Sequence, residues 1–141
     1  MTALNERPQV ALVIGAGDAT GGAIAKRFAA GGMTAAVTRR KRESLDDLVS
    51  EIESQGGSAH GFGCDARDEA AVIDLFETID RDIGDITVVV FNIGANVWFP
   101  IAETTERIFR KVWEMAAYAG FLAGREAAKV MQPRKQGTII F

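Results

Sequence analysis

The chain has 141 residues, of which 48% are hydrophobic and 25% charged, and its formal net charge is −3. This length suits one globular domain, and without a basic surplus nothing favours nucleic acid or an anionic membrane as a partner. A single cysteine excludes a disulfide framework, and with neither a signal peptide nor an apolar run of about 18 residues we expect a soluble, cytoplasmic domain.

The first half of the chain alternates short apolar runs with amphipathic segments. Val10–Ile14 is an unbroken apolar run that ends at a glycine, which is typical of a strand buried on both faces. From Gly21 to about Ala30 apolar residues recur four apart, which predicts an amphipathic helix closed by two glycines. A second strand is predicted over 34–38. Ser44 is then predicted to cap a helix through a weak capping box with Asp47.

The second half repeats this alternation. Its predicted elements are a strand over 58–64, a helix capped by Asp68, a strand over 86–91, a helix over 104–132 that Pro133 stops, and a strand over 137–141. The alternation predicts an α/β fold, a doubly wound parallel sheet with strand order 3-2-1-4-5. Because the apolar last residues have no polar exit, we expect residues 1–141 to be the N-terminal portion of a longer domain, truncated in its fifth strand.

The loop Gly15-Ala16-Gly17-Asp18-Ala19-Thr20-Gly21 joins the first strand to the first helix. Glycines permit a tight turn and let the backbone approach a pyrophosphate, while the N–H groups of the helix N-terminus face the anion. A glycine string alone is a weak signal, but between a buried strand and an amphipathic helix it predicts a dinucleotide-binding Rossmann fold. The alternative is a structural turn without a ligand.

Four cations cluster at the end of the second strand, where a NAD site normally places an acidic residue. The segment Thr38-Arg39-Arg40-Lys41-Arg42 suits charge-assisted contacts to a ribose 2′-phosphate, so NADP(H) is favoured over NAD(H). A solvated basic helix start is the alternative. Asp18 slightly opposes the NADP(H) prediction, because it adds negative charge near the phosphates.

Taken together, these motifs resemble those of the short-chain dehydrogenase/reductase family over essentially the whole chain. The resemblance is carried by the loop from Ile14 to Ala25, by Arg39-Arg40, by Cys64-Asp65-Ala66 and by Val90-Phe91-Asn92-Ile93-Gly94. It implies an NAD(P)-dependent oxidoreductase that transfers a hydride between a nicotinamide cofactor and a small carbonyl or alcohol substrate. The cofactor-binding residues expected from the loop and the resemblance are Gly15, Gly17, Asp18, Ala19, Thr20, Gly21, Arg39, Arg40, Asp65, Ala66, Asn92 and Gly94. In the family, the aspartate that corresponds to Asp65 of this chain contacts adenine.

Some residues depart from the family pattern. Ala19 replaces its middle glycine, and Ala116 stands where the family has a catalytic-site asparagine. The family's catalytic serine and Tyr-x-x-x-Lys pair would follow Phe141, so the catalytic residues are unknown and these residues alone are expected to be inactive. One alternative is a catalytically silent sensor or regulatory protein of the same fold, and another is a doubly wound protein for S-adenosylmethionine or a different nucleotide.

The remaining candidates have simpler interpretations. Tyr118 is interpreted as a core or interface aromatic, His60 as a strand or surface residue and no metal ligand, and Cys64 as a core residue. The aromatic loop over 97–100 either lines a substrate pocket or an interface, or packs under the long helix. In the family the helix corresponding to 104–132 commonly builds a dimer interface. We therefore expect a homo-oligomer, with the aromatic residues of that helix in the core or at the subunit contact.

Overall fold

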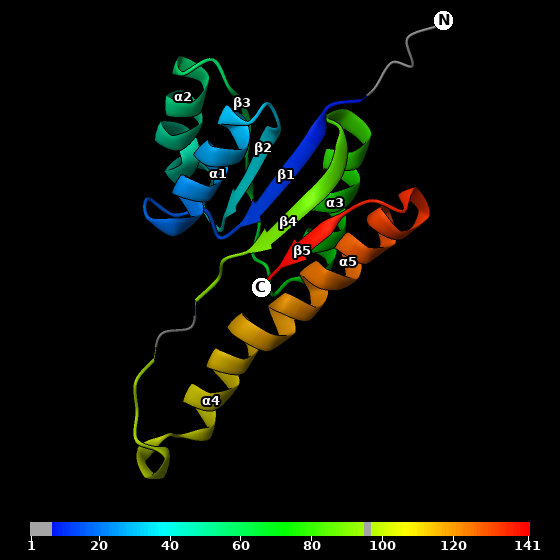
Figure 1. Ribbon diagram of the computed structural model, residues 1–141. Helices are drawn as coiled ribbons and strands as arrows, with labels where there is room; N and C mark the ends of the chain where they lie inside the picture. The colour runs from blue at the N-terminus through cyan, green and yellow to red at the C-terminus, as the bar shows by residue number, and fades with distance from the viewer. Residues whose placement is uncertain (1–6, 95–96) are drawn as a thin grey trace, which may run out of the picture.

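A computed structural model describes residues 7–94 and 97–141, and within them the predicted sheet is confirmed. Five parallel strands lie in the order β3-β2-β1-β4-β5. The strands are β1 (Gln9–Ile14), β2 (Thr34–Arg39), β3 (Ser58–Gly63), β4 (Asp85–Phe91) and β5 (Thr138–Ile140). The α-helices are α1 (Thr20–Ala30), α2 (Asp46–Ser54), α3 (Glu69–Asp82), α4 (Glu106–Trp113) and α5 (Ala119–Arg134). Figure 1 shows α1 and α2 on one face of the sheet and α3 and α5 on the other.

The core consists of two apolar layers separated by the sheet. Leu12 and Ile14 of β1 pack in the layer that includes α3 and α5, whereas Val13 packs in the layer of α1 and α2. Neighbouring residues of β1 therefore serve opposite faces, and both faces are covered. This double burial explains why the strand is a continuous apolar run, with no alternation of polar and apolar residues.

Two predictions about helix ends are wrong. Ser44 does not cap α2: it lies in a 3-10 turn, η1 (Arg42–Leu45), and its hydroxyl donates to the Lys41 carbonyl at 2.6 Å. The capping box with Asp47 therefore does not form. Pro133 does not stop the long helix, because α5 continues through it and ends where Lys135 takes a left-handed φ of 53°. A proline so close to the helix end disturbs only the last turn.

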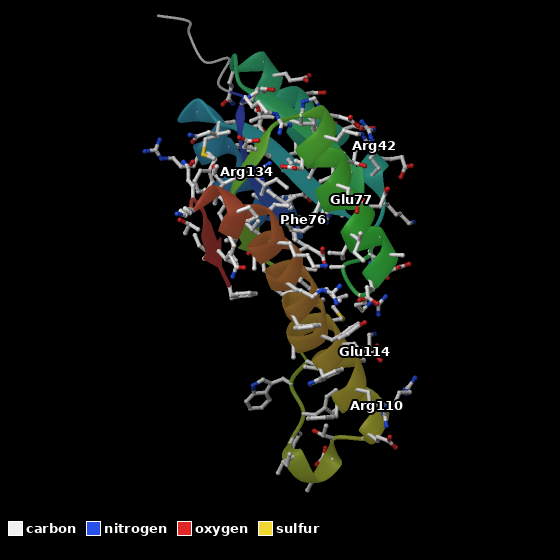
Figure 2. The ribbon with its side chains drawn as sticks, turned by 90° about the vertical axis from the view of Figure 1, so that its right-hand side faces the viewer. Arg42, Phe76, Glu77, Arg110, Glu114 and Arg134 are labelled. Atoms are coloured by element: carbon white, nitrogen blue, oxygen red, sulfur yellow. The ribbon has the colours of Figure 1, made fainter. Side chains whose placement is uncertain are left out.

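The predicted long helix is interrupted by a π-helical turn, η3 (Glu114–Tyr118), which joins α4 to α5. Figure 1 shows α5 lying against the sheet and α4 extending beyond its edge. In Figure 2, Phe76 lies between α3 and α5, in the core layer on that side of the sheet, whereas Arg110 projects from α4. Among the described residues, α4 contributes none to the core, and none of the helices has the length and apolarity that crossing a membrane requires.

Of the aromatic residues of the extension (α4, η3 and α5), Tyr118 packs against the core, whereas Trp113 and Phe121 do not. Trp113 and Phe121 are 51% and 57% exposed, while half-buried Tyr118 stacks on the Trp113 ring with a centroid separation of 5.9 Å. Trp98, in the loop between β4 and a second 3-10 turn, η2 (Ile101–Glu103), is 98% exposed. Packing of this tryptophan under the long helix is therefore excluded.

Candidate functional site

A cavity of about 190 Å³ lies at the carboxyl end of the sheet. This is the edge at which open parallel sheets bind ligands. Five of the predicted cofactor-binding residues line the cavity: Gly15, Arg39, Arg40, Asp65 and Ala66. Five others that were not assigned from the sequence also line it: Thr38, Cys64, Arg67, Ile93 and Met115.

The glycine loop turns tightly over the end of β1. Gly15 has a φ of 87°, a conformation that favours glycine. A Cβ at Gly21 would lie 2.6 Å from the Gly15 carbonyl oxygen, so α1 can approach the loop only with glycine at that position. The Asn92 side chain fixes the turn from β4, because its Nδ2 donates to the same carbonyl oxygen at 3.0 Å. Its backbone N–H also donates to the Ile14 oxygen at 2.8 Å.

The remaining predicted loop residues surround the cavity without lining it. Asp18, Ala19 and Thr20 are exposed, and α1 begins at Thr20. Within the described part of the chain, no side chain caps α1, and the Gly22 N–H of its first turn donates to the Gly17 carbonyl at 2.8 Å. The N-terminus of this helix is the place where an anion would bind. Gly94 is also exposed, at the end of the segment after β4.

The four predicted cations differ in their surroundings. Arg39 lines the cavity, but its Nη1 lies 3.8 Å from Asp18 Oδ1 and donates to the Ser44 carbonyl at 3.4 Å. Arg40 lines the cavity and is exposed. Arg42 pairs instead with Asp46 at 2.7 Å, one turn along the chain. The interpretation as a solvated basic helix start therefore describes Arg42, whereas Arg39 and Arg40 face the cavity.

Asp65, directly after β3, is held by an arginine two residues further on. Arg67 donates from Nε to Oδ1 at 3.0 Å, from Nη2 to Oδ2 at 2.7 Å, and from its backbone N–H to Oδ1 at 3.1 Å. The side-chain hydrogen bonds of Arg67 lower the pKa of Asp65 to about 2, so the carboxyl stays ionised. The short Asp-x-Arg spacing is the sequence feature that could have indicated this contact. Spacing alone, however, does not tell whether the two side chains meet.

Two other lining residues have different origins. Cys64 is buried, and burial together with the charge of Asp65 raises the pKa of its thiol to about 11, so the thiol is protonated at neutral pH. Met115 reaches the cavity from η3. Nothing in the periodicity of the long helix indicated this, because a π-turn changes which residues of a helix share a face. Ala116 lines a separate shallow groove with Phe141.

Comparisons with known proteins agree with this arrangement. The family model described as short chain dehydrogenase matches residues 9–141. Gluconate 5-dehydrogenase of Gluconobacter oxydans is 33% identical over 92% of this chain and 51% of its own length. The chain spans about half the length of the curated relatives it matches.

Solved structures show the same fold. A short-chain dehydrogenase from Rhodopseudomonas palustris is 50% identical with a TM-score of 0.89, over 94% of this chain and 62% of that one. A variant of actinorhodin polyketide ketoreductase, solved with NADPH, is 28% identical with a TM-score of 0.88, over 94% of this chain and 51% of that one. With its parallel Rossmann-type sheet and a family match over nearly its whole length, the chain belongs to the short-chain dehydrogenase family.

Proposed function

We propose that the chain supplies the cofactor-binding part of an NADP(H)-dependent oxidoreductase acting on a small carbonyl or alcohol substrate. The observation that carries this proposal is a cavity beside the glycine loop whose lining includes both arginines from the end of β2. Family membership supports a nicotinamide cofactor, which supplies the hydride when bound. The residues described below bind and orient that cofactor.

The proposed contacts follow the cofactor from its phosphates outward. Gly15, Gly17 and Gly21 leave room for the pyrophosphate, and the N-terminus of α1 lies next to it, with the exposed residues Asp18, Ala19 and Thr20 at its start. Asn92 fixes the loop by its hydrogen bond to the Gly15 carbonyl oxygen. Gly94 lies on the side of the site toward the nicotinamide. Arg39 and Arg40 bind the 2′-phosphate, and Asp65 and Ala66 bind the adenine. All twelve residues named in this paragraph are those expected from the sequence to bind the cofactor.

The preference for NADP(H) is tested by removing the arginines one at a time. Arg40→Ala and Arg39→Ala should each weaken NADPH binding by about tenfold and leave NADH binding nearly unchanged, because only NADPH carries the 2′-phosphate. The measurement is a fluorescence titration of the reduced nicotinamide. Arg40 should give the larger effect, because Arg39 already faces Asp18.

Arg42→Ala is the matched control. It removes a guanidinium from the same basic cluster, but one that pairs with Asp46 outside the cavity. If the Arg39 and Arg40 variants lost affinity for NADPH and for NADH by the same factor, the contact with the 2′-phosphate would be rejected. Binding of S-adenosylmethionine in place of both dinucleotides would reject the oxidoreductase proposal itself.

We further propose that the protein is a cytoplasmic homo-oligomer that associates through residues 104–132. The support is an exposed apolar surface formed by α4 and α5, on which Phe109, Trp113 and Phe121 are each more than half exposed. Several exposed aromatic side chains on one segment are typical of protein interfaces. The buried, protonated thiol of Cys64 is compatible with a reducing compartment.

A further inference from the structure

We propose that Arg67 is a positioning residue for base recognition, which fixes the Asp65 carboxylate as an acceptor for the exocyclic amino group of adenine. The site would then distinguish adenine from an oxopurine such as hypoxanthine, which carries an oxygen in place of that amino group. This inference rests on the proposed binding of an adenine dinucleotide in the cavity. It adds a residue that neither the glycine loop nor the basic cluster indicated.

The first argument is the number of acceptor positions left on Asp65. A carboxylate offers about four lone-pair positions. Oδ1 accepts two hydrogen bonds from Arg67 and Oδ2 accepts one. Over residues 7–94 and 97–141 no other donor reaches these oxygens. Oδ2 therefore retains one position, which matches the single N–H that an exocyclic amine directs at a carboxylate.

The second argument is orientation. The Asp65 side chain is 37% exposed, so without a partner its carboxylate would rotate in solvent. Two parallel N–H···O bonds from one planar guanidinium prevent that rotation. The loop backbone adds a further restraint, because Asp68 N–H donates to the Asp65 carbonyl at 2.9 Å. A ligand thus meets the acceptor in one fixed orientation, without losing side-chain entropy on binding.

The third argument concerns charge around the pair. Arg67 and, to a smaller extent, Arg40 from the end of β2 keep the Asp65 carboxyl ionised, while the hydrogen bonds of Asp65 and, to a smaller extent, the charge of Glu114 in η3 raise the pKa of the Arg67 guanidinium. Cys64, next to Asp65 in the chain, stays a neutral thiol. Asp65 is therefore an acceptor and never a donor at physiological pH, so it cannot satisfy the oxygen of hypoxanthine.

The test compares NADP⁺ with its analogue in which hypoxanthine replaces adenine, using isothermal titration calorimetry. Wild type should prefer the adenine form by about tenfold, the difference that one hydrogen bond to a charged acceptor makes. In Arg67→Met the affinity for NADP⁺ should fall until this preference is nearly lost, while that for the hypoxanthine analogue stays within about twofold. Arg67→Lys keeps the charge without the two-pronged geometry and should restore only part of the preference.

Arg81→Met is the matched control. Arg81 makes the same two-pronged contact with Asp82, at 2.8 Å for each bond, but it lies near the end of α3 and outside the cavity. This variant should keep the full preference for adenine. If Arg67→Met does not fold, a comparison of Arg67→Lys with Arg81→Met still tests the proposal. The preference for the adenine form should be reduced in Arg67→Lys and unchanged in Arg81→Met.

The outcomes separate this inference from the proposed function. If Arg67→Met lost affinity for NADP⁺ and for the hypoxanthine analogue by the same factor, the role of Arg67 would be overturned and the proposed function would stand. A wild-type preference for the hypoxanthine analogue would assign the base contact to the Arg67 N–H groups, and would overturn the inference as well. If wild type bound neither dinucleotide, the proposed function would fail and the inference with it.

Discussion

Gly17 and Gly21 of the phosphate loop are subject to different constraints. A Cβ at Gly21 would lie 2.6 Å from the Gly15 oxygen and 2.8 Å from the Ala16 Cα, both of which are backbone atoms. A Cβ at Gly17 would meet, among the described residues, nothing nearer than Arg39 Nη2 at 3.8 Å. The fold itself therefore requires glycine at position 21. At position 17 it does not, so a requirement for glycine there would come from a ligand.

This difference predicts two distinct mutant phenotypes. Gly21→Ala should lower the free energy of unfolding by about 1–3 kcal/mol, because neighbouring backbone must shift to accept the methyl group. Gly17→Ala should change it by less than about 0.5 kcal/mol but weaken NADPH binding, because the methyl group narrows the approach of the pyrophosphate. Urea denaturation measures the first quantity and fluorescence titration the second. Unchanged NADPH binding in Gly17→Ala would remove Gly17 from the phosphate site.

Single residues also show what the sequence could predict at the site. Arg39 and Arg40 were predicted because they lie at the end of a strand, and parallel strands bring their carboxyl ends to one edge, whereas Asp65 was predicted from the family resemblance. Arg67 was missed because its role depends on the rotamer that brings it back onto Asp65. Met115 was missed because its place depends on a π-turn. Motif position thus predicted which backbone segments meet, but not the side-chain contacts between them.

Among the elements, α3 and α4 begin with the same kind of cap but differ in what they bury. The Asp68 side chain accepts a hydrogen bond from Ala71 N–H at 3.1 Å, and the Thr105 hydroxyl accepts one from Ile108 N–H at 3.3 Å. The first cap was predicted as such, and the second lies one residue after the predicted start of the helix at position 104. α3 buries Phe76 and three other apolar residues, whereas none of the described residues of α4 is buried.

The two caps should therefore contribute differently to stability. Asp68→Ala should lower the free energy of global unfolding by about 1 kcal/mol, because α3 is part of the core. Thr105→Ala should leave global unfolding unchanged and speed amide exchange only in α4, which frays locally. Denaturation at low protein concentration, where association does not contribute, combined with hydrogen exchange distinguishes the two. Equal destabilisation by both variants would mean that α4 unfolds together with the core.

Elements were predicted well where burial fixes their pattern. All five strands, and the helices α1, α2, α3 and α5, follow from apolar runs and amphipathic periodicity, because these helices pack against the sheet. The errors lie at exposed helix ends. Ser44 bonded within its own turn, and Pro133 was accommodated in a last turn where little is packed. In such places local alternatives differ by too little free energy for a sequence pattern to decide between them.

At the scale of the whole molecule, both faces of β1 are covered, whereas α4 and the outward side of α5 in the α4–η3–α5 extension are not (Figure 1). Phe109, Trp113 and Phe121 leave 62%, 51% and 57% of their surface exposed along this extension. Burying one such aromatic side chain contributes about 1.5–3 kcal/mol. A second copy of the chain is the occupant we propose, and this makes stability dependent on protein concentration.

Phe121→Glu tests that proposal directly. A carboxylate at this position would have to be desolvated in the subunit contact, so the dissociation constant should rise by at least about 100-fold. Sedimentation velocity should show an oligomer for wild type and a monomer for the variant, and the melting temperature of wild type alone should rise with concentration. Ala70→Glu places the same charge on an exposed position of α3 and should leave association unchanged. If wild type stayed monomeric at high concentration, the proposal that a second copy binds this extension would be rejected. If Phe121→Glu still associated, the subunit contact would lie elsewhere on the molecule.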